Sequence, residues 1–410
     1  MAGRRGPLPP AGTPLLAYGQ GRSYGDSCLN SDGRLLLMRG LDRFLRFDAD
    51  TGVLACEAGV TLGEVLALAL PRGWFLAVTP GTRLATVGGA IANDVHGKNH
   101  HRNGSFGDHV RGFELLRSDG SRQWLAPGDA RFAATVGGLG LTGAITWAEL
   151  QLQRVSGPWM QVQSLKFDGL DEFFALSTES AESHEYTVAW VDCLAKGAAL
   201  GRGHFLRANH AAPGASGQAP GAGLAMPLTP PLSLVNRLTL RPFNTLYYHR
   251  QRARRREGVQ HYAPYFYPLD GIHDWNRMYG PAGFLQHQCV LPPAQAREAV
   301  RALLGEIARS GQGSFLAVLK EFGDRPAPGL MSFARPGTTL ALDFPNTGAP
   351  VFALLDRLDA IVAEAGGALY PAKDARMSPA MFRAGQPGLP AFLPHIDPAF
   401  SSSFWRRVME

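Results

Sequence analysis

One stretch, residues 80–107, concentrates residue types that could bind and act on an anionic ligand. It reads PGTRLATVGGAIANDVHGKNHHRNGSFG and contains six glycines, three histidines and one lysine. Glycine lets the backbone approach a ligand closely and adopt positive φ angles. Successive amide N–H groups in such turns form concave sites for anions. The stretch therefore predicts a backbone cradle for a phosphorylated cofactor, with ionisable side chains beside it.

Two further glycine-rich runs flank it, GQGRSYGD at residues 19–26 and GGLGLTG at residues 137–143. The second run contains the GxGxxG pattern of dinucleotide-binding proteins. That pattern is meaningful only where it opens a helix and an acidic residue follows about 20 positions later. The residues after Gly143, AITWAELQLQ, instead predict a strand. We therefore reject a nicotinamide site at this turn.

Together these runs resemble the flavin domain of the vanillyl-alcohol oxidase and p-cresol methylhydroxylase (PCMH) superfamily, and most of all its decaprenylphosphoryl-ribose 2-oxidase group. Members of that group show GRSYGD, PGT…VGGAIA.D.HGKNHH…GSFG and GG.GLTG in this order, and a fourth run, GGALYPAKD at residues 366–374, also matches. The resemblance covers nearly the whole chain. It implies a two-domain α+β protein of the PCMH type, with an FAD-binding domain and an antiparallel-sheet substrate (cap) domain.

The resemblance also implies which residues contact FAD. They are Gly21, Arg22, Ser23, Tyr24, Gly25, Asp26, Pro80, Gly81, Thr82, Gly88, Gly89, Ala92, Asn93, His96, Gly97, Asn99, Gly138, Gly140, Gly143, Ile145 and Tyr370. Many relatives carry a histidine where Tyr24 stands and bind the flavin covalently through it. Tyrosine cannot form that bond, so we expect non-covalent FAD. The alternative for residues 22–26 is an ordinary surface turn.

Three residues are expected at the reacting centre: Lys373, His96 and Tyr24. Lysine is an effective base only if burial or nearby cations bring its pKa well below about 10.4. The resemblance places the lysine of the AKDA motif at the flavin. There it would take the hydroxyl proton while hydride leaves the carbon for flavin N5; a solvated side chain is the alternative. His96 would bind the substrate hydroxyl, and Lys98 would neutralise an anionic group on substrate or cofactor.

The predicted substrate contacts are Lys98, Gln286, Gln288, Lys320 and Lys373. Gln286 and Gln288 alternate on one face of a predicted strand and would bind a polyhydroxylated substrate, and Lys320 would meet its phosphate; exposed strand positions are the alternative. The resemblance implies oxidation of the ribose 2-hydroxyl of a polyprenyl-phosphoryl pentose, with a short-chain reductase partner completing an epimerisation. The alternatives are an aldonolactone or alditol oxidase acting on a small soluble sugar, and a non-catalytic flavin-binding partner of a reductase.

Four histidines could suggest a metal-binding site, which we do not favour: His96, His100, His101 and His109. Glycines around His96 and His100 disfavour a helix that would carry both, and no carboxylate or cysteine set completes a tetrahedral site. The four cysteines are scattered without a CxxC pair, which indicates reduced thiols in a cytosolic protein.

The elements around these motifs are predicted by their periodicity. Residues 62–70 predict a helix that Thr61 caps, with Glu64 three positions on. Further helices are predicted over 294–309 and 350–365, and strands over 35–38, 44–47, 53–57, 110–117, 145–155, 186–194, 283–291, 315–322 and 338–344. We expect an FAD-binding domain over 1–160, a substrate-binding domain over 161–365, and a return to the FAD domain over 366–410. Relatives usually carry an extra strand and helix before GRSYGD, so the first domain is expected to be shortened.

Composition limits the partners. The chain has 410 residues and a formal net charge of +6, and it contains no apolar run of the roughly 20 residues that span a bilayer. We expect a cytoplasmic protein without a secretory signal, with contact at the inner membrane surface as an alternative. Residues 208–234, rich in Ala, Gly and Pro, predict a loop or lid. Arg250, Arg252, Arg254, Arg255 and Arg256, which have aromatic neighbours, predict either a solvated loop or a lipid-headgroup contact; no motif supports nucleic-acid binding.

Overall fold

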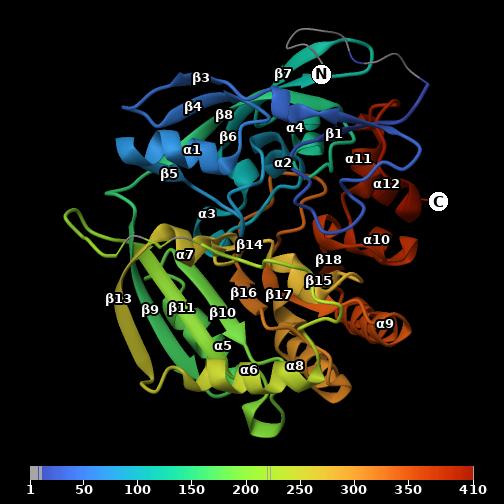
Figure 1. The fold of residues 1–410 in the computed structure, drawn as a ribbon. Helices are drawn as coiled ribbons and strands as arrows, with labels where there is room; N and C mark the ends of the chain where they lie inside the picture. Colours follow the sequence, from blue (N-terminus) through green and yellow to red (C-terminus); the bar gives the residue numbers. More distant parts are fainter. Residues whose placement is uncertain (1–7, 9–11, 219, 222, 410) are drawn as a thin grey trace. The chain divides into compact units, whose positions relative to one another are not determined.

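The computed structural model describes residues 8, 12–218, 220–221 and 223–409. The chain folds as two compact units, each made of segments that are distant in sequence (Figure 1). Unit 1 contains Met1–Pro158, Arg325–Arg335 and Pro371–Glu410, and unit 2 contains Trp159–Asp324 and Pro336–Tyr370. The FAD-binding role expected for residues 1–160 and 366–410, and the substrate-binding role expected for residues 161–365, stay predictions.

Unit 1 is built on an antiparallel sheet with the order β3-β4-β8-β6-β7, to which β5 adds beside β8. Its strands are β3 (Phe44–Phe47), β4 (Val53–Glu57), β5 (Trp74–Leu76), β6 (Val110–Leu116), β7 (Arg122–Leu125) and β8 (Ala144–Arg154). Along much of the long strand β8, buried and half-buried side chains alternate, as expected for a strand with one face on the core. Because β8 begins directly after Gly143, the predicted strand after the GLGLTG turn is confirmed.

Helix α1 (Leu62–Ala69) of unit 1 begins as the sequence predicts. The Thr61 hydroxyl accepts a hydrogen bond from the Glu64 amide at 3.2 Å, and the Glu64 carboxylate accepts one from the Thr61 amide at 2.7 Å. This capping box satisfies two backbone donors that the first helical turn leaves unpaired. The other short helices in this part of unit 1 are α2 (Val87–Ala92), α3 (His100–Asn103) and α4 (Ala130–Thr135), with 3₁₀ turns η1 (Met38–Gly40), η2 (Leu70–Arg72) and η3 (Phe106–His109).

The C-terminal segment of unit 1 packs against its first described strand. Strand β1 (Leu15–Tyr18) pairs in parallel with β2 (Arg34–Leu37). The Leu15 amide donates to the Ala399 carbonyl at 2.7 Å, and the Ser401 amide donates to the Leu15 carbonyl at 2.9 Å. The segment itself forms η7 (Pro371–Lys373), α10 (Pro379–Gly385), α11 (Leu389–Phe392), η8 (Leu393–His395) and α12 (Ser403–Met409). Residues from both ends of the sequence therefore form one substructure.

Unit 2 is built on an eight-stranded antiparallel sheet with the order β13-β9-β11-β10-β16-β17-β15-β18. Its strands are β9 (Trp159–Phe167), β10 (Tyr186–Val191), β11 (Gly203–His210), β13 (Arg255–His261), β15 (Phe284–Leu291), β16 (Ala317–Phe322), β17 (Gly337–Pro345) and β18 (Ala368–Leu369). A parallel two-stranded pair, β12 (Leu224–Ala225) with β14 (Ile272–His273), lies apart from this sheet.

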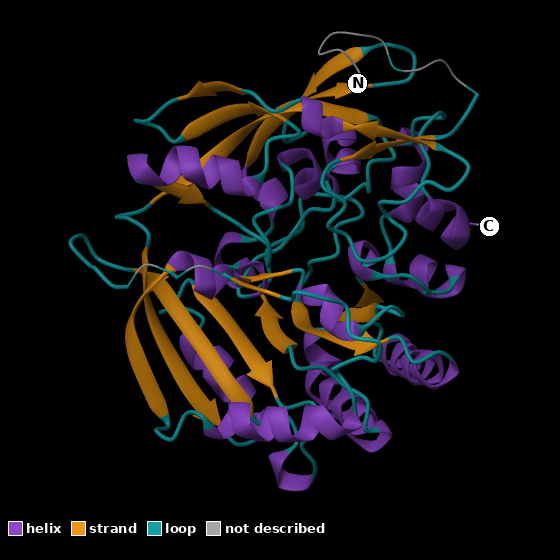
Figure 2. Cartoon of the chain, in the orientation of Figure 1, coloured by secondary structure: helices purple, strands orange, loops and turns teal. Residues whose placement is uncertain are grey.

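Helices pack on the strands of unit 2. Helix α5 (Leu170–Ser180) contacts β10 and β11, whereas α8 (Pro293–Ser310) and α9 (Ala349–Glu364) lie side by side and contact β15 (Figure 2). The remaining elements are α6 (Arg237–His249), α7 (Tyr262–Phe266) and the 3₁₀ turns η4 (Gly197–Ala199), η5 (Leu269–Gly271) and η6 (Trp275–Tyr279). The predicted helices over 294–309 and 350–365 are confirmed by α8 and α9.

Two expectations for unit 2 need correction. Residues 208–234 are not all loop, because β11 runs to His210 and Leu224–Ala225 form β12. The arginine cluster is not a simple solvated loop, because Arg255 and Arg256 lie in β13 and pair with β9. Helix α6 between these segments was not predicted. Pro242, a residue that disfavours helix interiors, lies inside this helix, and one of its buried positions is the polar Asn244.

Within the part of the chain that the structure describes, no helix has both the length and the apolar character to cross a membrane.

Candidate active site

The GRSYGD loop and the AKDA loop of unit 1 are in direct contact. The Tyr24 amide donates to the Ala372 carbonyl at 2.9 Å. A Cβ added at Gly25 would lie 1.6 Å from the carbonyl oxygen of Asp374, so only glycine permits this approach. Two motifs from opposite ends of the sequence are thus held backbone to backbone.

Two of the predicted catalytic residues, Lys373 and Tyr24, lie against each other at this contact. The Lys373 Nζ is 3.8 Å from the centroid of the Tyr24 ring. An ammonium group over an aromatic face is attracted by the ring quadrupole. The tyrosine therefore restricts where the lysine side chain can point, which a proton-transferring group requires.

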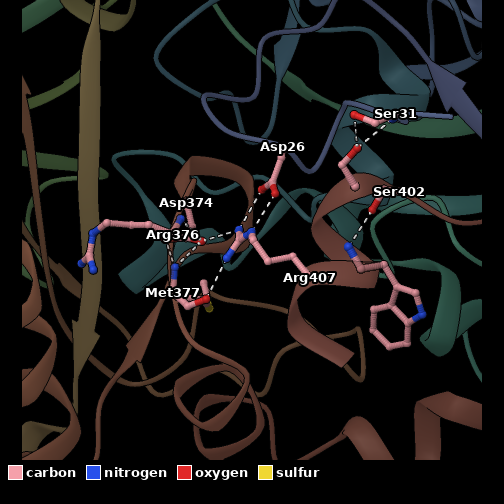
Figure 3. A network of polar contacts seen from close by, with 9 residues as sticks. Asp26, Ser31, Asp374, Arg376, Met377, Ser402 and Arg407 are labelled. Carbon is pink, nitrogen blue, oxygen red and sulfur yellow. Dashed lines mark hydrogen bonds and ion pairs between the residues drawn. The ribbon is translucent and has the colours of Figure 1, made fainter. Parts of the chain in front are cut away.

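Arg407 of α12 ties the same two loops together, as Figure 3 shows. Its Nε and Nη2 donate to the two carboxylate oxygens of Asp26 at 2.7 and 2.8 Å. Nη2 also donates to Asp374 Oδ2 at 2.9 Å, and Nη1 donates to the Met377 carbonyl at 2.7 Å. Asp26 ends GRSYGD and Asp374 follows Lys373, so one guanidinium holds both loops.

The charges of this network affect one another. Burial raises the pKa of the Asp374 carboxyl, against the lowering by the Met377 amide and by Arg407. The hydrogen bonds to Asp26 and Asp374 raise the pKa of Arg407 further, so it stays cationic. Arg407 was not predicted from the sequence, since a C-terminal arginine carries no local signal of partners at the other end of the chain.

Asp94, inside the long glycine-rich stretch, is a second residue that the sequence analysis missed. It is fully buried and accepts hydrogen bonds from Ser105 Oγ at 2.8 Å, the Gly107 amide at 2.9 Å and Ser332 Oγ at 2.5 Å. Burial raises its pKa to about 6, although these three donors act in the opposite direction. Asp94 fastens the stretch to the segment Arg325–Arg335, which the sequence analysis had placed inside the middle domain.

His96 and His100 do not share a helix. His96 forms an isolated antiparallel bridge with Ser105, whereas His100 begins α3. The His96 ring is buried and lies 5.6 Å from the Phe333 ring, centroid to centroid. Among the described residues, no group of three or more His, Cys, Asp or Glu side chains could hold a metal ion.

The third glycine-rich turn of unit 1 contacts the end of α2. The Leu139 amide donates to the Ala92 carbonyl at 2.8 Å, and the Gly137 amide donates to the Ile91 carbonyl at 3.0 Å. Gly140 has a φ of +76°, which glycine adopts without strain. The predicted cofactor contacts at Ala92 and in residues 138–143 therefore lie together.

The predicted substrate residues of unit 2 lie on two strands of the same sheet. Gln286 and Gln288 are on β15, and Lys320 is on β16, with β17 between them. Gln288 Nε2 donates to Thr339 Oγ1 at 3.3 Å, and Thr339 is the register partner of Lys320. Gln286 Nε2 donates to Asp343 Oδ1 at 2.5 Å. The structure thus brings Gln288 and Lys320 to the two sides of one threonine.

Tyr370, predicted to contact FAD, ends the last segment of unit 2. Its amide donates to the Gln288 carbonyl at 2.9 Å.

Comparison with known proteins agrees with these motifs. A family model for an FAD binding domain matches residues 9–126. The decaprenylphosphoryl-β-D-ribose oxidase of Mycolicibacterium smegmatis is 38% identical over 416 residues, which cover 97% of this chain and 89% of the relative. The chain belongs to this family of PCMH-type FAD-binding oxidoreductases. The protein is an FAD-dependent oxidoreductase that acts on CH–OH donors.

Two other relatives show how far the similarity extends. An uncharacterized protein encoded in the mprA 5′ region of Streptomyces coelicolor is 37% identical over 85% of this chain and 100% of its own length. An alditol oxidase of a Streptomyces species is 30% identical, but only over 30% of this chain and 29% of the relative. The similarity to the family therefore spans both units, whereas that to the alditol oxidase is partial.

The residues of unit 1 fit a bound FAD. Asn99 donates through Nδ2 to the Ala77 carbonyl at 2.8 Å, while its buried Oδ1 accepts no hydrogen bond from any described residue. A buried acceptor left without a donor is costly, so a donor from a ligand would stabilise it. A Cβ at Gly81 would meet no atom within 4 Å, so open space lies beside the backbone of the PGT turn. Both positions are among those predicted to contact the cofactor.

Proposed function

We propose that the protein oxidises a secondary alcohol of a sugar, namely the ribose 2-hydroxyl of a polyprenyl-phosphoryl pentose. The observation that carries the proposal is the placement of Lys373 against Tyr24, on loops that Arg407 holds together. The similarity to the M. smegmatis oxidase over 97% of the chain supports the choice of substrate.

The proposed reaction divides the work between cofactor and chain. FAD, when bound, supplies the hydride acceptor. In its neutral form, Lys373 takes the proton of the hydroxyl at Nζ, and the Tyr24 ring attracts the ammonium group that forms. His96 binds the reacting hydroxyl group and orients it. Lys98 offsets negative charge on the substrate or cofactor.

The remaining proposed contacts recognise the substrate. Gln288 and Gln286 present amide groups that suit sugar hydroxyls, and the Lys320 ammonium suits the phosphate. Gln288 is fixed on one side by Thr339, so its amide has a defined orientation. A short-chain reductase that reduces the resulting ketone to the epimeric alcohol is the proposed partner.

We also propose that FAD is bound non-covalently, because Tyr24 occupies the position at which many relatives carry a flavin-linked histidine. The purified protein is expected to be yellow. Acid precipitation should release the FAD into the supernatant, where its absorbance can be measured. Flavin that stays on the precipitated chain would contradict the proposal.

The substrate is tested by anaerobic reduction of the bound flavin, followed by the loss of its visible absorbance. We expect rapid bleaching with detergent-solubilised polyprenyl-phosphoryl ribose and slow or no bleaching with free ribose, alditols or aldonolactones. Faster bleaching by a small soluble polyol would favour an alditol-type oxidase. No bleaching by any sugar, with FAD bound, would favour a flavin-binding protein without turnover.

A further inference from the structure

Helix α6 of unit 2 has an apolar stripe on its exposed side. Leu238, Pro242 and Leu246 follow one another at intervals of four residues and therefore share one face of the helix. The Leu238 and Leu246 residues are 85% and 72% exposed. The opposite face packs inward, where Tyr248 donates a hydrogen bond to Asp168 and Asn244 donates one to Asp192 at 3.2 Å.

The segment before α6 continues the same composition. Leu224, Leu228, Leu232 and Leu234 are all exposed. Single exposed leucines are normal on protein surfaces, but six in one short stretch with the helix are not. Leu238 and Leu246 share one exposed face of α6, and exposed apolar surface of this kind marks a site of interaction with a protein or a membrane.

The charged residues within this stretch of the sequence all have one sign. From residue 193 to residue 256 the sequence contains ten lysines and arginines and no aspartate or glutamate. Arg241, Arg250 and Arg252 are exposed and form no ion pair with a described acidic residue; Arg250 stacks on the Tyr247 ring at 3.9 Å. The apolar stripe is therefore accompanied by cations without counter-charges.

The five arginines between residues 250 and 256 differ in whether a carboxylate of unit 2 neutralises them. Arg254 pairs with Asp168 and Glu172, and Arg255 pairs with Glu257. These two side chains are partly neutralised within unit 2. The cations that remain for an outside partner include those on and directly after α6.

We propose that the exposed face of α6 with the arginines on and directly after it, which we call the α6 surface (residues 237–252), docks on an anionic lipid bilayer. Leucine side chains on one helix face with arginines beside them are typical of helices that lie in a membrane interface. The long arginine stems let the guanidinium groups reach lipid phosphates while the leucines enter the acyl boundary. A second copy of the chain is a poorer occupant, because pairing would bring two acid-free stretches together.

The inference deepens the proposed function, since a polyprenyl-linked substrate resides in such a bilayer. Only the reason for docking, which is access to a lipid-linked substrate, rests on the proposed function. Binding to vesicles needs no substrate, so the two proposals can fail separately.

The test is co-sedimentation of the FAD-loaded full chain with phosphatidylcholine vesicles, with and without phosphatidylglycerol. We expect binding to the anionic vesicles that weakens strongly with added salt. The double substitution Leu238→Ser and Leu246→Ser should weaken binding by about tenfold or more, because two leucines that would enter the acyl boundary are lost. Arg241→Ser with Arg252→Ser should weaken it by about fivefold for each arginine.

Leu37→Ser with Leu45→Ser is the matched control, because both leucines are exposed but belong to unit 1. This variant should bind vesicles like the unchanged protein. FAD absorbance and the thermal midpoint of each variant report whether it is folded. Equal vesicle binding by the α6 variant and the control, or no binding by the unchanged protein, would overturn the inference.

Two further measurements separate the alternatives. Light scattering that shows a dimer or larger assembly, lost in the Leu238→Ser and Leu246→Ser variant, would assign the α6 surface to a protein partner and overturn the lipid assignment. Flavin reduction by polyprenyl-phosphoryl ribose in detergent tests the proposed function alone. If reduction fails while vesicle binding persists, the proposed function fails and the docking surface stands.

Discussion

Lys373 reaches its position through two loops that are far apart in the sequence. Replacing it by methionine keeps much of the side-chain volume and removes the amine. We expect Lys373→Met to retain FAD but to lose substrate-driven flavin reduction by about 10²–10⁴-fold, the range for loss of a general base. Stopped-flow absorbance under anaerobic conditions measures this rate.

Lys196→Met is the control for this change, because Lys196 is an exposed lysine of unit 2 outside the predicted site. It should reduce its flavin at the unchanged rate. Undiminished reduction by Lys373→Met at saturating substrate would remove Lys373 from the mechanism.

Asp94 makes the stability of the protein depend on pH. Its pKa is about 6 in the folded chain, against about 3.9 for an unfolded aspartate. The folded chain therefore binds a proton more readily than the unfolded chain does. The stability gained from that proton is present below about pH 4 and is lost as the pH rises through 6.

Asp94→Asn carries no charge at either pH and should lack this trend. Relative to Asp94→Asn, the free energy of unfolding of the unchanged protein should rise by up to roughly 3 kcal/mol between pH 7 and pH 4. Denaturant titrations of the two proteins at matched pH values measure the difference. Parallel pH profiles would show that Asp94 keeps an ordinary pKa.

At the scale of elements, α12 fixes the loops of the site through Arg407. Removing the guanidinium leaves Asp26 and the buried Asp374 without their shared cation. We expect Arg407→Ala to lower the free energy of unfolding by roughly 2–4 kcal/mol, below the value for a fully buried pair because the arginine is partly exposed. Flavin reduction should slow as well, since the Lys373 loop loses its anchor.

Arg383→Ala is a suitable control for the loss of a C-terminal arginine. Arg383 lies in α10 and donates to the Met409 carbonyl at 3.2 Å, with no carboxylate partner among the described residues. It should lower stability by less than Arg407→Ala. Arg407→Lys should restore only part of the effect, because lysine cannot bind Asp26 through two donors. Equal stability of the Arg407→Ala and Arg383→Ala proteins would contradict the assignment.

At the scale of the whole molecule, unit 1 is assembled from three separate segments of the chain. A protein that contains only residues 1–158 would lack Ser332, which binds Asp94, and Arg407, which binds Asp26. We expect this fragment to bind FAD at least about tenfold more weakly than the full chain does, because buried donors and acceptors of the site would be unpaired. Fluorescence titration with FAD measures the affinity. Full affinity in the fragment would show that the later segments are dispensable for the cofactor.

The sequence by itself determined the features that depend on neighbouring residues. The capping box of α1, the strand after Gly143, the long helices α8 and α9, and the glycine turns follow from local patterns that few residues specify. The same local motifs carried the resemblance that predicted an FAD-dependent oxidoreductase, and the comparisons confirm that class.

Only the tertiary structure decided which distant residues meet. Asp94 reads as an ordinary polar residue until Ser332 and the Gly107 amide close around it, and Arg407 reads as a solvated arginine until Asp26 and Asp374 flank it. Helix α6 escaped prediction because Pro242 lies inside it and one of its buried positions is the polar Asn244. Local pattern fixes the turn of a backbone, whereas burial and charge pairing arise from contacts between segments, and sequence spacing does not encode those contacts.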